Sequence, residues 1–433
     1  MKLPSQCAIL VGGLGTRMGQ LTANTPKPLL DCGGRPFLAW ILRELSRFGI
    51  EEVVLLAGYQ SERIDEFCRQ VPLWLPKPLS IQVSVEPSRA GTGGAVWYAR
   101  DLLKDTFLLI NGDSWIDANL ARFLAAAGAA PEAAGCVLLR AMEDCTRYGT
   151  VELQGNSITA FREKASVRAP GLINCGIYVL DKSALSMLSP NCSMELDILP
   201  ALAAKRLLTG HVLDGAFIDI GIPADYARAR EELPRCLMRP AIFFDRDSVL
   251  NEDLGRVGNK DRFQWLPGAR EAVRFVNDAG FHALVVTNQA GVARGLYSEA
   301  DIESLHRHMI QDLLAEGATI DDFRYCLFHP AGVMEIYRRD SSWRKPAHGM
   351  ILDLLARWSI EGRRSILVGD KESDIETARA AGVKGYFYPG GNFLEFVEPL
   401  VTQLRRVAVG APSPVSDARA TGSDCPCCPR KYR

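Results

Sequence analysis

Short apolar runs alternate with segments of helical periodicity along this chain, and this alternation constrains the fold more than any other feature. Toward the N-terminus the apolar runs fall at 8–11, 53–57 and 81–85, and the helical segments at 37–48, 63–68 and 94–103. Strands and helices that alternate in this way build a parallel sheet with helices packed on its faces. The first half is therefore predicted to have an α/β fold.

Two later stretches of the first half add detail to this prediction. An apolar run at 107–110 leads into Asn111-Gly112-Asp113, which places Asp113 at the carboxyl end of a strand, where α/β sheets bind their ligands. The stretch 136–180 reads as strands with a turn at 154–156. We expect that stretch to form a lid-like or substrate-side insertion.

Two prolines, Pro234 and Pro240, interrupt the alternation, and a new apolar run begins directly afterwards. The pattern then resumes, with apolar runs at 241–244, 283–286 and 365–368 and helical segments at 298–314 and 374–381. A chain of 433 residues is long enough for two or three domains. We predict two α/β domains, at 1–235 and 239–408, and a tail at 410–433, rich in Gly, Ala, Pro and Ser, that is expected to be disordered.

The charge balance narrows the kinds of partner. The chain carries 50 Lys and Arg against 51 Asp and Glu, so no excess of positive charge is available to bind a nucleic-acid backbone. It contains no apolar run of about 18 residues, and the run at 7–11 is too short for a signal peptide. We expect a cytoplasmic protein with small charged substrates and with neither a nucleic-acid nor a membrane partner. The oligomeric state is left open.

The cysteines indicate no disulfide framework. Nine of the 12 are scattered through apolar or strand-like contexts, where small buried thiols are common, and we expect them to be reduced. The other three, Cys425, Cys427 and Cys428, cluster near the C-terminus without a histidine or a second cysteine pair nearby. No function is assigned to that cluster.

A glycine-rich segment follows the first apolar run directly. It contains Gly12, Gly13, Gly15, Thr16 and Arg17. Glycines there let backbone N–H groups approach phosphate oxygens closely, although glycines alone also fit a tight strand-to-helix turn or a dinucleotide site. Further along, Lys27 lies between two prolines that hold its amine on a fixed path.

The spacing Gly-Gly-x-Gly-Thr-Arg-Met followed by Pro-Lys-Pro resembles the signature of the sugar-phosphate nucleotidyltransferases, over about the first 230 residues. The resemblance implies a Rossmann-like fold of the GT-A-like type. It assigns nucleotide contacts to Gly12, Gly13, Gly15, Thr16, Gly91, Thr92 and Gly93, sugar-phosphate contacts to Glu163, Lys164 and Asn174, catalytic roles to Arg17 and Lys27, and a Mg²⁺ site to Asp113 and Asp219.

The chemistry of nucleotidyl transfer explains these residue types. A sugar 1-phosphate is already an anion and can attack the α-phosphorus of a nucleoside triphosphate without a general base. The protein must mainly neutralise charge, with Mg²⁺ held by the two aspartates and with Arg17 and Lys27 at the departing pyrophosphate. Each residue alone has a structural alternative, such as an aspartate that caps a helix, but their joint occurrence in this order favours an active site.

A second set of motifs begins at Asp245-Arg246-Asp247, directly after the apolar run at 241–244. Alternate residues at a strand end can direct two carboxylates into one crevice of a sheet. An Asp-x-Asp pair is common on surfaces, but here three further blocks follow it in order, Thr287-Asn288-Gln289-Ala290-Gly291, Arg344-Lys345-Pro346 and Gly369-Asp370-Lys371. Together the four blocks resemble the haloacid dehalogenase superfamily of phosphohydrolases.

Within that superfamily, the motifs are most similar to the heptose bisphosphate phosphatases and their histidinol phosphatase relatives. The resemblance implies a Rossmannoid fold in which Asp245 is the nucleophile, and Asp247 first protonates the leaving oxygen and then activates water. It assigns Mg²⁺ to Asp245, Asp370 and the backbone carbonyl of Asp247, and substrate contacts to Thr287, Asn288, Arg344, Lys345 and Lys371.

Two departures from the family pattern concern the phosphatase half. The family's glycine after the Asp-x-Asp motif is replaced by Ser248, so a serine must form that turn. The four positions of the family's zinc ligands hold Cys326, Phe328, Ser341 and Trp343, with His329 adjacent. Because one or two ligands do not close a tetrahedral site, we predict that zinc is absent and that Phe328 and Trp343 pack to shape the loop.

Taken together, the two resemblances predict a bifunctional enzyme of nucleotide-activated heptose synthesis. Its phosphatase half would produce heptose 1-phosphate, and its transferase half would consume that product with a nucleoside triphosphate, which the family resemblance suggests is GTP. Mg²⁺ is expected at both sites. The alternatives are the same two reactions on another sugar phosphate or on histidinol phosphate, or one half that is an inactive regulatory module.

Overall fold

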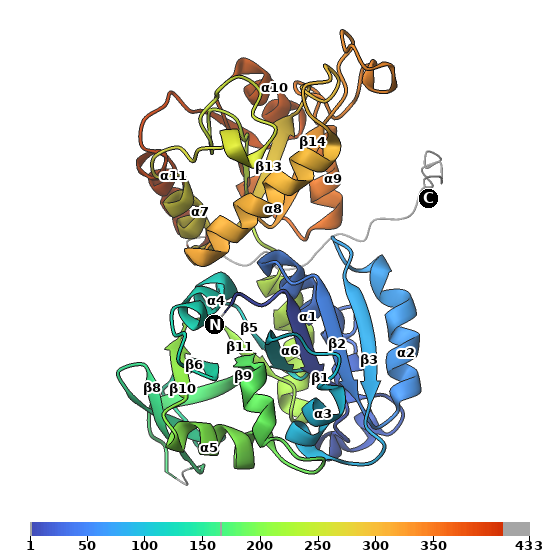
Figure 1. Ribbon diagram of the computed structural model, residues 1–433, viewed down its shortest axis with the longest axis vertical. Helices are drawn as coiled ribbons and strands as arrows, with labels where there is room; N and C mark the ends of the chain where they lie inside the picture. Colours follow the sequence, from blue (N-terminus) through green and yellow to red (C-terminus); the bar gives the residue numbers. More distant parts are fainter. Residues whose placement is uncertain (1, 165–166, 410–433) are drawn as a thin grey trace.

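A computed structural model of the chain describes residues 2–164 and 167–409. The expected tail at 410–433, with Cys425, Cys427 and Cys428, lies outside the described residues. Figure 1 shows two lobes stacked along the long axis of the molecule, each built on its own sheet. The nine cysteines within the described residues are all free, and six of them are buried.

The first half forms a nine-stranded sheet in the order β3-β2-β1-β4-β9-β6-β10-β8-β7. Its strands are β1 (Gln6–Leu10), β2 (Glu52–Ala57), β3 (Ser80–Val85), β4 (Thr106–Asn111), β6 (Gly135–Met142), β7 (Thr150–Gln154), β8 (Ser157–Arg162), β9 (Gly171–Asp181) and β10 (Leu208–Val212). Strands β3, β2, β1 and β4 are parallel, as the alternation predicts. A separate antiparallel pair joins β5 (Ser114–Ile116) to β11 (Phe217–Asp219).

The stretch 136–180 does not form the lid-like insertion that its turn suggested. Strand β9 lies inside the sheet and is antiparallel to both β4 and β6. Its residues are mostly buried and apolar, so it is stable only where helices cover both faces of the sheet. The hairpin of β7 and β8, which turns at Gly155, comes last in the strand order, and β7 also pairs with β9.

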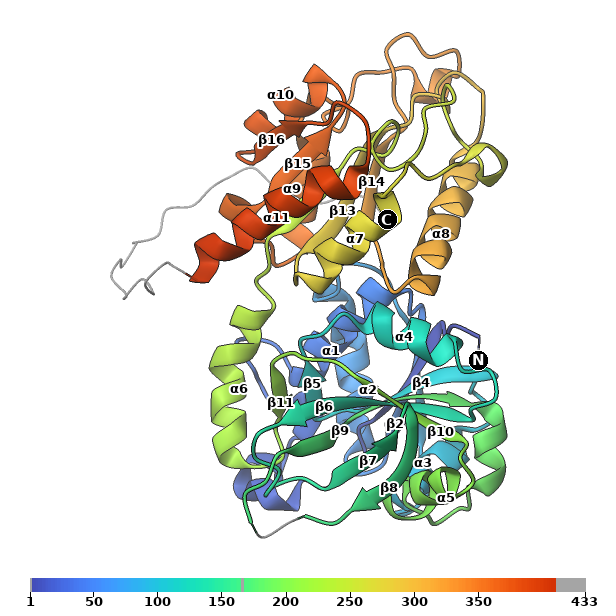
Figure 2. The same ribbon diagram turned by 90° about the vertical axis from the view of Figure 1, so that its left-hand side faces the viewer.

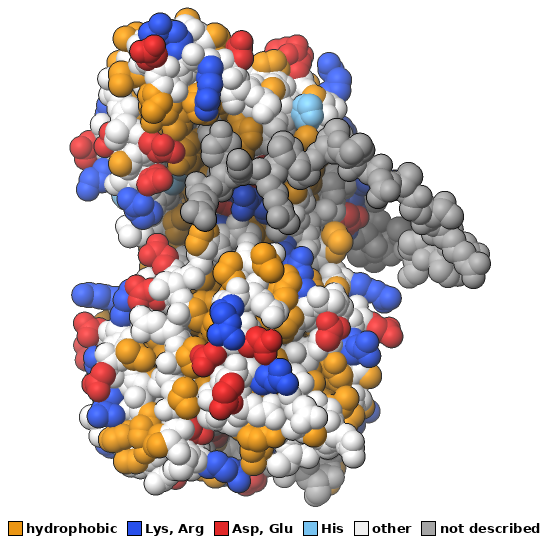
Figure 3. All heavy atoms as spheres, turned by 90° about the vertical axis from the view of Figure 1, so that its right-hand side faces the viewer, with side chains coloured by type: hydrophobic (Ala, Val, Ile, Leu, Met, Phe, Trp, Pro, Cys, Tyr) orange, Lys and Arg blue, Asp and Glu red, His pale blue; other side chains and the backbone are white. Residues whose placement is uncertain are grey.

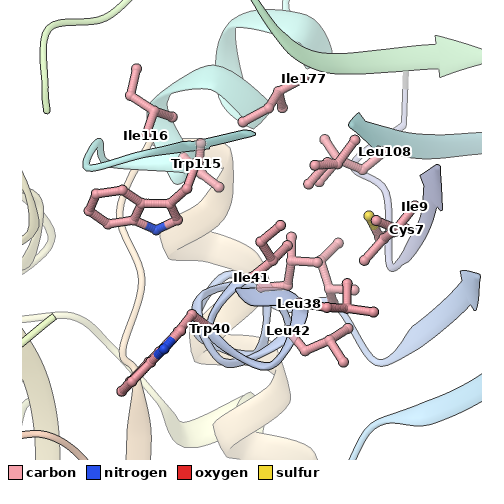
Figure 4. Packing of buried hydrophobic residues seen from close by; sticks show 14 of the residues in the cluster. Cys7, Ile9, Leu38, Trp40, Ile41, Leu42, Leu108, Trp115, Ile116 and Ile177 are labelled. Carbon is pink, nitrogen blue, oxygen red and sulfur yellow. The ribbon is translucent and has the colours of Figure 1, made fainter. Parts of the chain in front are cut away.

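Helices cover both faces of this first sheet. They are α1 (Phe37–Leu45), α2 (Ser61–Gln70), α3 (Gly91–Ala99), α4 (Leu120–Gly128), α5 (Leu199–Ala204) and α6 (Pro223–Cys236). One buried cluster joins α1, α2, α4 and α6 to one face, and another joins α3 and α5 to the other. Figure 4 shows Leu38 and Ile41 of α1 pointing toward Cys7, Ile9 and Leu108 of the sheet. Successive residues of a strand therefore point to opposite faces of the sheet and belong to different clusters.

The second half forms a parallel five-stranded sheet in the order β14-β13-β12-β15-β16. Its elements are β12 (Ala241–Phe244), α7 (Ala269–Asp278), β13 (His282–Asn288), α8 (Glu299–Ala315), β14 (Asp322–Cys326), α9 (Gly349–Arg357), β15 (Ile366–Gly369), α10 (Glu372–Ala380), β16 (Lys384–Phe387) and α11 (Phe393–Val409). Helices α7, α8 and α11 pack on one face, and α9 and α10 on the other (Figure 2). Both halves therefore have the α/β architecture predicted.

The two lobes meet through the amino ends of their strands. Arg239 precedes β12, and Asp321 precedes β14, and both contact residues near the end of α1. Leu314 of α8 belongs to the same buried cluster as α1, so apolar packing continues across the junction. Because ligands of α/β sheets bind at the carboxyl ends of the strands, the two ligand-binding edges face away from each other.

Buried charges join the two lobes. Arg239 places Nη1 2.7 Å from Oε2 of Glu44 and Nη2 2.6 Å from Oδ1 of Asp117. Arg47 lies 3.0 Å from the same Glu44 carboxylate and 2.9 Å from Asp321. All of these side chains except that of Asp117 are almost completely buried. Removing one partner of such a network leaves an uncompensated buried charge.

Acid should weaken this junction. Burial lowers the pKa of His282 to about 4, although its Nδ1 lies 2.8 Å from Asp321. An unfolded histidine gains a proton near pH 6.5 whereas the buried one stays neutral, so the free energy of unfolding should fall as the pH drops from about 6.5 to about 4. We expect a loss of about 1–3 kcal/mol across that window in urea unfolding. A His282→Gln variant should lack this dependence, and an unchanged slope in the variant would contradict the assignment to His282.

The surface carries charges of both signs. Figure 3 shows Lys and Arg side chains interspersed with Asp and Glu side chains on the face it displays, without a continuous basic stripe. Among the described residues, no helix combines the length and the apolar character that a membrane span requires.

Two candidate active sites

A cavity of about 470 Å³ opens at the carboxyl ends of β1 and β4. It is lined by the predicted residues Gly12, Gly13, Gly15, Lys27, Gly91, Thr92 and Asp113, among others. A Cβ atom at position 12 would lie 2.8 Å from the backbone nitrogen of Gly58, and Gly15 has φ 61°. Glycine is therefore required at both positions, by close backbone approach at the first and by left-handed backbone at the second.

Asp113 lines this cavity, and the other predicted metal-binding residue, Asp219, pairs across strands with Ser114, the residue after Asp113. The amino group of Lys27 pairs with Asp113, and Asp219 accepts a hydrogen bond of 2.7 Å from the backbone N–H of Gly221. Burial, and then the negative charge of Asp113, raise the pKa of Asp219, while Lys27 and Arg17 oppose that rise. A carboxylate whose pKa is raised by the charge of a neighbouring carboxylate forms, with that neighbour, a site that fits a divalent cation.

Several predicted transferase residues do not line this cavity. Thr16 and Arg17 lie in an exposed 3₁₀ turn after the glycines, and Arg17 reaches the Asp219 side of the site. The N–H of Gly93 donates to the carbonyl of Cys192 at 2.9 Å, so this glycine allows α3 to pack closely against another segment. Glu163 and Lys164 are exposed beyond the end of β8.

Asn174 also has structural partners. Its Nδ2 donates to the hydroxyl of Tyr178 at 2.9 Å, and its Oδ1 accepts from the backbone N–H of Gly176. These bonds lie within β9, where Gly176 has φ 72° and the pairing with β6 is irregular. The predicted sugar-phosphate contacts of Asn174, Glu163 and Lys164 therefore remain predictions.

Two charged residues of the cavity, Glu86 and Arg89, received no role from the sequence. Glu86 follows β3 directly, and its Oε2 accepts a hydrogen bond of 3.3 Å from the backbone N–H of Ala90. Burial raises the pKa of this carboxyl group. Glu86 lies at the carboxyl end of a parallel strand, which is the feature that identifies Asp113 in the sequence. The same feature could have identified Glu86.

The second candidate site lies at the carboxyl ends of β12 and β15. Nζ of the buried Lys345 lies 2.8 Å from Oδ2 of Asp245 and 2.6 Å from Oδ1 of Asp374. Burial and the charge of Asp374 raise the pKa of Asp245, while Lys345 opposes the rise. Asp374 received no role from the sequence, because a helix-start aspartate usually caps its own helix, and its Oδ2 also accepts from the N–H of Lys371.

These carboxylates fit a divalent cation. Oxygen atoms of Asp245, Asp370 and Asp374 all lie within 4.8 Å of one another. Oδ1 of Asp370 is buried without a hydrogen-bond partner, which is costly unless a cation or another ligand engages it. Hard oxygen ligands of this kind suit Mg²⁺. The side chain of Asp247 lies outside this cluster, which agrees with a role other than carboxylate ligand.

Donors surround the carboxylate of Asp247. Arg246 directs Nε and Nη2 at Oδ1, at 3.1 and 2.8 Å, and Nδ2 of Asn251 lies 3.2 Å from the same oxygen. Nε2 of Gln289 donates to Oδ2 at 3.1 Å. Arg246, Asn251 and Gln289 are almost completely buried, so these donors hold Asp247 in a defined orientation.

The other predicted phosphatase residues lie around this centre. Thr287 is buried at the end of β13. Asn288 makes two hydrogen bonds to the backbone of Lys345, at 3.0 and 3.1 Å, so it positions that lysine. Nζ of Lys371 lies 3.3 Å from Asp370; burial opposes the charged lysine, but the charges of Asp370 and Asp245 together raise its pKa. Arg344 is partly buried and donates to the carbonyl of Phe328 at 3.4 Å.

Both departures from the family pattern are visible. Ser248 adopts φ 66°, so a serine does form the left-handed turn expected of it. In the loop without the zinc ligands, Phe328 and Trp343 pack against the core cluster of the second lobe, as predicted. The guanidinium of Arg339 lies 4.1 Å from the ring centre of Phe328. Aromatic packing thus shapes this loop.

Comparison with known proteins finds relatives of both halves. Residues 7–235 match the model of the nucleotidyl transferase family, and residues 342–405 match the HAD-hydrolase-like model. A solved structure of HddC from Yersinia pseudotuberculosis, complexed with GMP-PN, covers 53% of this chain and 99% of its own, with 29% identity and a TM-score of 0.46.

Two curated relatives match the two halves separately. The D-glycero-β-D-manno-heptose-1,7-bisphosphate 7-phosphatase of Rhodopseudomonas palustris is 44% identical over 40% of this chain and 95% of its own length. The D-glycero-α-D-manno-heptose 1-phosphate guanylyltransferase of Aneurinibacillus thermoaerophilus is 34% identical over 53% of this chain and 98% of its own length. The chain therefore belongs to the nucleotidyl transferase family through its first half and to the haloacid dehalogenase-like phosphatases through its second.

Proposed function

We propose that this chain catalyses two consecutive steps in the synthesis of a nucleotide-activated heptose. The second half removes the 7-phosphate of D-glycero-D-manno-heptose 1,7-bisphosphate, and the first half joins the resulting heptose 1-phosphate to GMP from GTP, with release of pyrophosphate. The observation that carries the proposal is that one chain matches a relative of each enzyme over nearly that relative's full length. We place the two catalytic units at 1–235 and 239–408, and the enzyme in the cytoplasm, where GTP is available.

In the phosphatase half, Asp245 attacks the phosphorus atom and the bond to the sugar oxygen breaks. Asp247 gives a proton to that oxygen, and Lys345 offsets the charge of the aspartyl phosphate. Asp247 then takes a proton from the water that hydrolyses the phosphoenzyme. The short distance from Lys345 to Asp245 supports this assignment. Mg²⁺, held by Asp245, Asp370 and the carbonyl of Asp247, with Asp374 nearby, would neutralise phosphoryl oxygens.

In the transferase half, the sugar phosphate oxygen attacks the α-phosphorus of GTP and pyrophosphate departs. The glycine loop receives the triphosphate on its backbone N–H groups, and Arg17 and Lys27 offset the charge that accumulates on the leaving group. Mg²⁺, held by Asp113 and Asp219, would supply further neutralisation at the α-phosphate. The pairing of Lys27 with Asp113 supports this arrangement.

The anomeric configuration must agree between the two steps. Hydrolysis at C7 leaves C1 untouched, so the configuration of the bisphosphate passes unchanged to the transferase. The phosphatase relative is named for the β-anomer and the transferase relative for the α-anomer. We infer that the transferase half requires the α-anomer and that the phosphatase half therefore accepts the α-bisphosphate. The loop that contains Phe328 and Trp343, which departs from the family pattern, would be the part of the phosphatase half that permits this.

The assay that tests the proposal supplies each anomer of heptose 1,7-bisphosphate with each nucleoside triphosphate in turn, and follows phosphate, pyrophosphate and sugar nucleotide. We expect all three products from the α-anomer with GTP. Phosphate release without sugar nucleotide under every condition would contradict the pairing of the two steps, and a sugar nucleotide formed only from the β-anomer would contradict the anomer assignment.

We further propose that Glu86 selects guanine. Guanine presents two adjacent donors, N1–H and N2–H, which an ionised carboxylate can accept together. Uracil and adenine would instead direct an acceptor toward that carboxylate. The Glu86→Gln variant converts one of the two acceptors to a donor, so we expect kcat/KM for GTP to fall about 100-fold, while activity with UTP or ATP stays equal or rises. Arg89→Gln, at the same cavity, serves as the comparison. An unchanged preference for GTP in Glu86→Gln would contradict the assignment.

A further inference from the structure

The two oxygens of the Asp247 carboxylate have different surroundings. Oδ1 receives three N–H groups, two from Arg246 and one from Asn251, at 2.8–3.2 Å. Oδ2 receives one, from Nε2 of Gln289. An oxygen with three donors has no lone pair left to take a proton, whereas Oδ2 retains that capacity. Proton transfer by Asp247 must therefore use Oδ2.

The direction of the Gln289 amide depends on Tyr297. The hydroxyl of Tyr297 donates to Oε1 of Gln289 at 2.9 Å, which leaves Nε2 of Gln289 directed at Asp247 and at Oγ1 of Thr287, 3.0 Å away. Gln289 is 1% exposed, so it has no solvent partner for the opposite amide orientation. Burial raises the pKa of Tyr297, which keeps its hydroxyl protonated and able to donate.

The ring of Tyr297 is itself held in a slot made by two glycines. A Cβ atom at Gly258 or at Gly291 would lie 2.1 Å from atoms of that ring, so a side chain at either position would displace it. Gly291 stands two residues after Gln289, in the loop that follows β13. The backbone thus fixes the tyrosine, the tyrosine fixes the glutamine, and the glutamine contacts the oxygen that is free to carry a proton.

We propose that Tyr297 and Gln289 are positioning residues that hold Oδ2 of Asp247 toward the leaving oxygen of the phosphatase substrate. In the first step the proton on Oδ2 moves to the sugar oxygen as the P–O bond breaks and Asp245 gains the phosphoryl group. In the second step the same Oδ2 takes a proton from the attacking water as inorganic phosphate leaves. This inference rests on the proposed phosphatase function of the second half.

The test measures the hydrolysis of two phosphate esters by the Tyr297→Phe variant. Its ring still fills the slot and only the hydroxyl is lost. A sugar phosphate leaves as an alkoxide that needs a proton, whereas p-nitrophenyl phosphate leaves as a phenolate that does not. Because kcat/KM covers only the steps through leaving-group departure, we expect it to fall about 10-fold for the sugar phosphate and to change by less than about 2-fold for the aryl ester.

A second variant and a matched control complete the test. Gln289→Glu replaces the donor at Oδ2 with an acceptor of the same shape, and should produce the same selective loss together with an altered pH profile for the sugar phosphate. Tyr325→Phe removes a tyrosine hydroxyl that contacts the exposed Glu299 instead, and should leave the hydrolysis of both substrates unaffected. Equal losses on both esters, or no loss on either, would overturn the positioning role. Asp245→Asn, which should abolish both hydrolyses, tests the phosphatase function separately.

Discussion

Asp245→Asn should reduce phosphate release from heptose 1,7-bisphosphate by about 1,000-fold or more, and should leave nucleotidyl transfer to supplied heptose 1-phosphate unchanged. The variant keeps the size of the side chain and removes the nucleophile. Lys27→Ala should do the reverse, with a loss of about 100–1,000-fold in transfer, because Asp113 and the departing pyrophosphate both lose their counter-charge. Phosphate and pyrophosphate release, measured separately, distinguish the two effects.

A mixture of the two variants extends this test to the path of the intermediate. The sites lie at the carboxyl ends of two sheets whose amino ends meet, so heptose 1-phosphate must cross solvent to pass between them. Equal amounts of Asp245→Asn and Lys27→Ala should therefore form sugar nucleotide from the bisphosphate with the same lag and the same rate as wild-type chain at the same concentration of each active site.

Two outcomes would contradict this picture. If either variant lost both activities while its circular dichroism spectrum remained that of the native protein, the two sites would not be independent. If the wild-type chain showed a clearly shorter lag than the mixture, the intermediate would pass directly from one site to the other.

Arg239→Met should lower the free energy of unfolding by about 3–5 kcal/mol. The arginine is 4% exposed and lies between Glu44 of α1 and Asp117, so its loss leaves the buried Glu44 with only Arg47 as a partner. Methionine keeps most of the aliphatic stem, so the effect reports the lost charge rather than a cavity. Urea unfolding followed by circular dichroism measures the change.

The control for that variant is Arg228→Met. Arg228 forms an exposed ion pair with Glu232 within α6, 3.4 Å apart, and such pairs contribute about 0–1 kcal/mol. If both variants lost equally little stability, the buried network would not hold the lobes together. Because Arg239 precedes β12 while Glu44 belongs to the first lobe, we also expect the two lobes of Arg239→Met to unfold in separate transitions.

The sequence was most informative where chemistry follows a strand directly. Gly12, Asp113 and Asp245 each come just after an apolar run, and local rules place such residues at the carboxyl edge of a sheet. The same rules failed for β9. Its position beside β4 and β6 depends on pairing between strands that are far apart in the chain, so its local pattern wrongly predicts an insertion.

Residues whose roles depend on distant neighbours are not recognised from the sequence. Glu86 and Gln289 each follow an apolar run, yet the proposed role of Glu86 depends on a cavity and that of Gln289 on a tyrosine that the fold brings near. Asp374 reads locally as a helix cap, and only the approach of Lys345 from a distant loop places it in the charged centre. Hydrogen bonds and ion pairs of this kind join residues that no local pattern relates.

The sequence by itself determined the two α/β units and the order of their catalytic motifs, because strand and helix periodicity and the residues at strand ends are local properties. Only the tertiary structure decided how the units are joined. Nothing in the sequence distinguishes Glu44, Arg47, Arg239 and Asp321 from ordinary surface residues. Their charges are buried between the lobes because the strand ends of the two sheets meet there. The same arrangement turns the two catalytic edges away from each other.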